Sequence, residues 1–266
     1  MIYANPVPRN EVYYLGFDEL EPLRRFLAAK LEKHVPSLEY YSDQNFAGFY
    51  HKHEKDKPRM SKSSTSTCAL SLISAGKWNA GPWKDNAAQT LRVFLTDRCQ
   101  SAELKTNNPF TVAFVLEAAH ALMQFVPSSL SPRLRRRMRL AEKLLKTEII
   151  TGSVSLLGYP PSAYLTQLVT RVLASRNAVD DATRSRILDW PWRELDHQLA
   201  LLHANSKNAD VFQLAYCMIL VSDVGDPGEA TPEQSLISQT ALDVFFERQL
   251  PDGSWPRSRP PFITPV

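Results

Sequence analysis

The sequence predicts an all-α fold in which helices are arranged in pairs. Apolar side chains recur every three or four residues over most of the chain, which is the period of an amphipathic helix. No run of four to eight alternating, β-branched residues lies between turn residues, so strands should be few or absent. The 266 residues include 9 glycines and 19 prolines, a balance that disfavours Gly-rich phosphate loops and tight hairpins and suits helices that begin at proline.

Two regions of different organisation are expected, residues 1–60 and residues 61–266. In the first region, Asp18 and Glu21 form a capping pair for an amphipathic helix over residues 18–34. The next residues, as far as Arg59, lack a sustained period and should be irregular. The second region is expected to be a domain of helical repeats that is incomplete at its C-terminal end.

Capping residues and prolines predict where the helices of the second region begin. A short helix rich in small side chains follows Ser61 and ends at Gly76, which can adopt the left-handed cap conformation. With the helix of the first region, about ten helices are expected. The others are expected over residues 86–98, 108–126, 131–147, 159–173, 180–188, 191–204, 211–220 and 231–249.

Composition and charge exclude several classes of protein. The net charge of +3, from 31 basic and 28 acidic residues, lacks the strong basic bias of a typical nucleic-acid-binding chain. Cys68, Cys99 and Cys217 lie far apart without a C-x-x-C pair, which indicates neither a disulfide framework nor a zinc ribbon. The N-terminal residues lack the apolar segment of a signal peptide, so none is expected, and the longest apolar stretch, residues 112–126, is too short to cross a bilayer. A cytoplasmic protein without a membrane span is expected.

The most specific motif lies near the C-terminus. Gln249, Gly253 and Trp255 fit the pattern Q-x-x-x-G-x-W, and two phenylalanines precede them. This resembles the QW-type repeat turn of the terpenoid cyclase and protein prenyltransferase superfamily, and residues 64–78 are similar to the inner helix and G-x-W exit of such a repeat. The resemblance implies a partial α/α toroid in which the Gln side chain reaches the end of a neighbouring helix. Helical pairs also occur in HEAT-like arrays, so a solenoid or an irregular bundle is the alternative.

The catalytic motifs of that superfamily are missing. The chain has no D-x-D-D, and Asp180-Asp181 lack the third carboxylate of D-D-x-x-D. Asp97, Cys99 and His120 could be matched to the zinc ligands of prenyltransferases only by an arbitrary alignment. No catalytic residue, metal or cofactor is therefore expected.

Several residues are candidates for binding, each with a structural alternative. The densest charge cluster could bind phosphates or an acidic protein, or be a solvated face; its candidate residues are Arg133, Arg135, Arg136, Arg139 and Lys143. Three aromatic side chains could line a pocket or belong to the core: Tyr164, Trp190 and Trp192. His51 and His53 could bind a metal or lie in a solvated loop. His120 is expected to be a core histidine, and Asp180-Asp181 to cap a helix.

Two functions from different classes follow. The first is a non-catalytic, toroid-like module that binds a partner or regulates a larger protein or complex. About ten helices are fewer than a closed six-pair toroid needs, so we expect a protein partner or a further domain to cover an open C-terminal end. The second is an isoprenoid-processing enzyme with an aromatic-lined central cavity, since aromatic faces stabilise carbocations. Phosphate or nucleic-acid binding through residues 133–146 is a weaker alternative.

Overall fold

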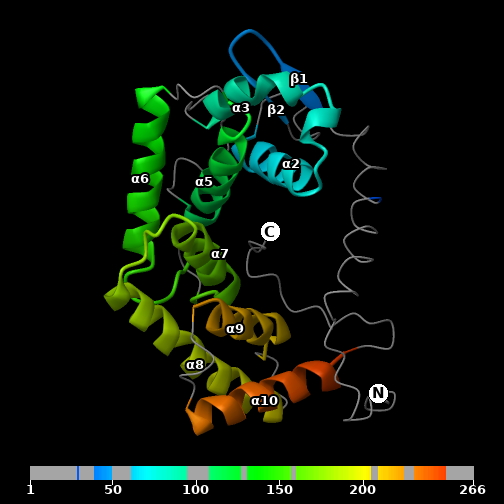
Figure 1. Ribbon diagram of the computed structural model, residues 1–266. Helices are drawn as coiled ribbons and strands as arrows, with labels where there is room; N and C mark the ends of the chain where they lie inside the picture. The colour runs from blue at the N-terminus through cyan, green and yellow to red at the C-terminus, as the bar shows by residue number, and fades with distance from the viewer. Residues whose placement is uncertain are drawn as a thin grey trace. The chain divides into compact units, whose positions relative to one another are not determined.

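The computed structural model describes residues 39–49, 61–94, 108–126, 131–156, 160–204, 209–224 and 231–249, together with Ala29. These residues are mostly helical, which confirms the all-α class, and one two-stranded sheet accompanies the helices (Figure 1). They form two compact units, an N-terminal unit up to Leu144 and a C-terminal unit from Leu145 onward. The toroid, the predicted helix over residues 18–34 and the predicted boundary at residue 60 stay predictions.

A β-hairpin opens the described part of the N-terminal unit, where the sequence analysis predicted irregular structure. Strands β1 (Tyr40–Ser42) and β2 (Ala47–Phe49) pair antiparallel. The side chain of Asp43 forms the turn, because one of its carboxylate oxygens accepts hydrogen bonds from the backbone N–H groups of Asn45 and Phe46, each at 2.7 Å. The prediction was wrong here because strands of three residues are too short to show an alternating pattern.

The hairpin is tied to the first helix of the unit, α2 (Lys62–Ser74). The Phe49 N–H donates to Thr65 Oγ1 at 3.0 Å, and the same hydroxyl donates to the Phe49 carbonyl oxygen at 3.1 Å. Both residues are buried, so this exchange satisfies backbone groups that water cannot reach.

Among the described residues, the N-terminal unit also contains two short 3-10 turns and three more helices, and the last of these helices continues a few residues into the C-terminal unit. They are η2 (Trp78–Ala80), η3 (Lys84–Asn86), α3 (Ala87–Val93), α5 (Pro109–Met123) and α6 (Pro132–Glu148). The predicted cap residues Ser61, Asn108 and Ser131 each accept a backbone N–H from the first turn of α2, α5 and α6. Gly76 ends the α2 region at φ +67°, as predicted. Helix α3 ends at Val93, short of the predicted residue 98, and residues 95–98 lie outside the described part.

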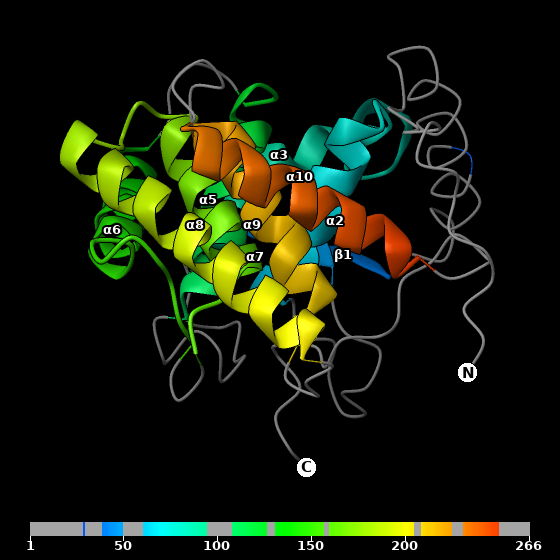
Figure 2. The ribbon, with the colours of Figure 1, turned by 90° about the horizontal axis from the view of Figure 1, so that it is seen from below.

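The described part of the C-terminal unit contains four further helices, α7 (Ala163–Ala174), α8 (Asp181–His203), α9 (Val211–Val224) and α10 (Pro232–Glu247). Helix α9 packs against α7 and α8, and α10 packs across α8 and α9 (Figures 1 and 2). Helix α7 begins two residues after Pro161, behind the cap Ser162. Helix α10 begins as predicted, with Thr231 and Gln234 forming a reciprocal capping box.

Helix α8 corrects one prediction, because the two expected helices at 180–188 and 191–204 are one. Pro191 lies inside this helix. Proline removes an N–H donor and usually breaks a helix. Here Ile187, Pro191 and Leu195 are all buried on one side, at a spacing of four residues. The continuous buried stripe holds the helix together across the proline.

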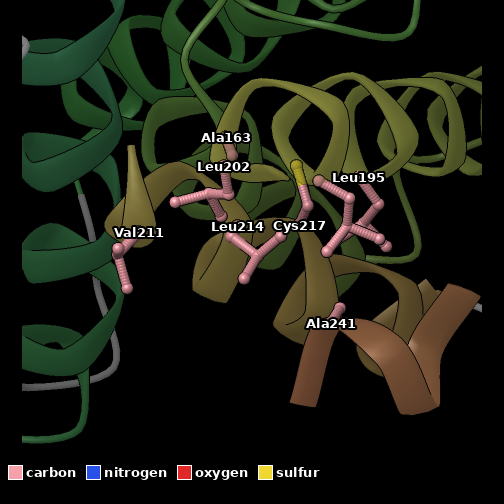
Figure 3. Close-up of a cluster of buried hydrophobic side chains, with 8 residues drawn as sticks. Ala163, Leu195, Leu202, Val211, Leu214, Cys217 and Ala241 are labelled. Carbon is pink, nitrogen blue, oxygen red and sulfur yellow. The ribbon is translucent and has the colours of Figure 1, made fainter. Parts of the chain in front are cut away.

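The four helices of the C-terminal unit share one core (Figure 3). Its buried members come from all four helices: Ala163, Leu195, Leu199, Leu202, Val211, Leu214, Cys217 and Ala241. The N-terminal unit has its own core, in which α2 packs against α5 through small side chains, including Ala69 and Ala113.

Candidate functional site

Helix α6 carries the strongest charge feature of the described chain. It has seven basic and two acidic side chains, a net charge of +5 against +3 for the whole protein. Its basic face consists of the five residues singled out from the sequence: Arg133, Arg135, Arg136, Arg139 and Lys143. All five side chains are exposed, whereas Leu134, Met138 and Leu145 of the same helix are buried. The structure thus brings the predicted residues together on one solvent-facing helix.

A pocket with a volume of about 330 Å³ lies in the N-terminal unit between α5 and α6. Its walls are mainly apolar side chains: Phe94, Val112, Val115, Leu116, Ala119, Leu134, Met138, Leu140, Ala141 and Leu144. Among the residues that the structure describes, its polar lining side chains are Lys62, Asn108 and Arg137, none of them acidic. Helix α6 does not pack closely on α5, whereas α2 does, which leaves this space between them.

Two of the described polar side chains of the pocket lie at the starts of helices. Lys62 is only 5% exposed and is the first residue of α2. Asn108 caps the start of α5, where its side chain accepts the Phe110 N–H at 2.9 Å. Helix N-terminal ends carry partial positive charge, so two helix starts and two basic side chains all favour an anion. The sequence did not predict this pocket; the apolar stripes of α5 and α6 indicate only that one side of each helix is buried.

The predicted aromatic residues lie elsewhere, in the C-terminal unit. Trp190 and Trp192 are half-buried on α8 and pack against the core cluster of Figure 3. Tyr164 on α7 is also half-buried, and its ring centroid lies 4.8 Å from that of Tyr216. None of the three candidate residues lines the pocket between α5 and α6.

Asp180 acts as a helix cap, as the sequence indicated. Its carboxylate accepts the Thr183 N–H at 2.7 Å at the start of α8, and this hydrogen bond lowers the pKa of Asp180. His120 lies half-buried on α5, and Gln249 follows α10. The other candidates, including the rest of the Q-x-x-x-G-x-W motif, lie outside the described residues: His51, His53, Asp97, Cys99, Gly253 and Trp255.

Nucleophilic and metal chemistry find little support in the described chain. Burial raises the pKa of the Cys68 thiol to about 11, and burial together with Glu194 raises the pKa of the Cys217 thiol further. Both thiols are therefore protonated at neutral pH. Among the residues that the structure describes, no three His, Cys, Asp or Glu side chains lie close enough together to hold a metal ion. None of the described helices is both long enough and apolar enough to span a bilayer.

Comparison with known proteins adds no relative. No protein-family model matches the chain, and no curated protein or solved structure is significantly similar to it. The resemblance to the toroid superfamily therefore depends on the motif residues alone.

Proposed function

We propose that this chain is a non-catalytic helical module, part of a larger protein or complex, that binds an acidic protein surface through the basic face of α6. The observation that supports this most is the concentration of charge. One helix carries +5 while the other residues together carry −2, since the total is +3. A solvated face needs charged side chains for solubility, but these can be of both signs and need not gather as basic residues on one helix.

An acidic protein is favoured over nucleic acid as the partner. A long duplex is a polyanion that extends well beyond one helix, and the chain outside α6 has a net negative charge that would repel it. An acidic segment or patch of a protein can be limited to the length of α6. Charge complementarity of this kind steers association and selects the partner.

Zero-length carbodiimide cross-linking tests the proposal in cells that express the protein. This reagent joins a lysine amine directly to a carboxylate that it contacts, so Lys143 reports an acidic partner on the basic face. We expect peptides rich in Asp and Glu from one partner protein to be linked to Lys143.

A charge-removal variant and a matched control make the test specific. Arg135→Gln, Arg136→Gln and Arg139→Gln together should reduce the Lys143 cross-link by about tenfold or more, because each exposed charge pair contributes up to about 1 kcal/mol. The control removes three exposed arginines of the C-terminal unit, with Arg171→Gln, Arg184→Gln and Arg193→Gln, and should retain the link. Equal loss in both variants, or tight binding of duplex DNA by the parent chain with a strong salt dependence, would overturn the proposal.

A further inference from the structure

We propose that the pocket between α5 and α6 binds a monocarboxylate with a short apolar chain, of about the size of octanoate. This ligand site is separate from the basic face of α6, because the pocket is lined by the opposite, apolar side of the helix. Leu134 and Met138 are buried there, while Arg135 and Arg139 are exposed. The two sites can therefore be tested independently.

The walls of the pocket select the apolar part of the ligand. Val112, Leu116 and Ala119 lie on one stripe of α5, and Leu134, Met138 and Ala141 lie on one stripe of α6. Leu140, at 51% exposed, also belongs to the lining. An alkyl chain placed between the two stripes removes apolar surface from water on both helices, which is the main driving force for binding in such a pocket.

The charge of the pocket selects an anion with a single charge. Of the described residues that line the pocket, Lys62 and Arg137 carry a charge, and both are basic. The start of α2 at Lys62 and the start of α5 behind Asn108 add partial positive charge. Lys62 is only 5% exposed, so a head group that contacts it must give up much of its water. A carboxylate gives up water at a lower cost than a doubly charged phosphate.

The volume of the pocket sets the size of the ligand. At about 30 Å³ for each water-sized group, a volume of about 330 Å³ holds on the order of ten heavy atoms. Octanoate has about that number of heavy atoms, whereas a long-chain fatty acid has considerably more and would extend beyond the pocket. The volume is also at the lower end of the range found for small-molecule sites, about 300 to 1,000 Å³.

Calorimetric titration of the full chain with three probes of equal chain length tests the proposal. The probes are octanoate, octan-1-ol and octylammonium, which differ only in the head group. We expect octanoate to bind at least about tenfold more tightly than octan-1-ol, because a charge-assisted hydrogen bond adds to the apolar contribution. Octylammonium should bind most weakly because it meets two basic side chains.

Two variants locate the site. Ala141→Phe fills the pocket from a half-buried position and should abolish binding of all three probes. Arg137→Gln should weaken the binding of octanoate by about five- to tenfold and leave the affinity for octan-1-ol unchanged. Arg135→Gln, on the basic face, should change neither affinity. Circular dichroism checks that each variant is folded. If Ala141→Phe does not fold, the comparison of octanoate binding by Arg137→Gln and Arg135→Gln alone tests whether the ligand lies in the pocket.

Two results would overturn the proposal: no octanoate binding at millimolar concentration, or octanoate and octan-1-ol binding equally well. Retained binding in folded Ala141→Phe would do the same. None of these results bears on the cross-link at Lys143, so failure of the pocket proposal is distinguishable from failure of the proposed partner surface.

Discussion

Replacing Gln213 by Leu should destabilise the C-terminal unit, because this side chain joins three helices. Gln213 lies in the first turn of α9, and its Oε1 accepts the backbone N–H of Ala163, the first residue of α7, at 2.9 Å. Its Nε2 donates to the Pro161 carbonyl oxygen at 3.0 Å and to Glu194 of α8 at 3.3 Å. The side chain thus satisfies one of the N–H groups that the start of α7 leaves without an intrahelical partner.

The size of the effect follows from what each partner can do after the change. Ala163 is 0% exposed, so its N–H loses its partner in a place that water does not reach, at a cost of about 1–3 kcal/mol. Pro161 is exposed and its carbonyl can bind water instead. Glu194 keeps its hydrogen bond from Gln198 at 2.8 Å. We therefore expect Gln213→Leu to lower the free energy of unfolding by about 2 kcal/mol, mostly from the Ala163 N–H.

Urea unfolding followed by circular dichroism measures this loss. Gln239→Leu on α10 is the matched control, because Gln239 is exposed and its side chain donates a hydrogen bond to Asp243 of the same helix at 3.1 Å. The control should change the free energy of unfolding by less than about 0.5 kcal/mol. Equal effects of the two substitutions would refute the reasoning, since the Ala163 N–H would then have found another partner.

Three further changes have expected outcomes. Gly152→Ala should lower the melting temperature by several degrees, because Gly152 has φ +90° and a Cβ would collide with the Arg186 carbonyl oxygen; an unchanged melting curve would contradict this. The pKa of Asp180 is lowered, so its contribution to stability is present above the ordinary carboxyl pKa and is lost as the pH falls through the lower folded value. Asp180→Ala should therefore be less stable than the parent at pH 7, with the gap shrinking below about pH 4 in urea titrations; a constant gap would contradict the cap. In a Cys99→Ser background, Cys68 should react with a disulfide reagent at pH 8 far more slowly than a free thiol, since its pKa is about 11; fast labelling would show that the thiol is accessible and ionised.

The starts of the helices could be predicted because capping is local. Ser61, Asn108, Ser131 and Thr231 each accept a backbone N–H two or three residues further along the chain. Everything that this interaction needs lies within one turn of sequence. The left-handed residue at Gly76 could be predicted for the same reason.

The β-hairpin and the unbroken helix α8 could not be predicted in this way. Strand β2 is held by Thr65, which lies sixteen residues after Phe49, and by burial against the following helices. Helix α8 continues through Pro191 because its buried side, at Leu195, Leu199 and Leu202, packs on α9, an element that begins twenty residues after this proline. In both places a tertiary contact overrides the local preference, and a single sequence does not show which contact forms.

Helix α6 shows most clearly the difference between features that depend on one helix and features that depend on how two helices pack. Its basic face could be read from the sequence, because exposed charge at helical spacing depends on α6 alone. Its apolar side could be recognised as buried, but not as half of a pocket. That depends on how closely α6 approaches α5, and on Lys62, which lies seventy residues before Pro132. A charged surface is a property of one element, whereas a cavity is a property of the distance between elements. The octanoate titration therefore tests the part of this structure that the sequence could not supply.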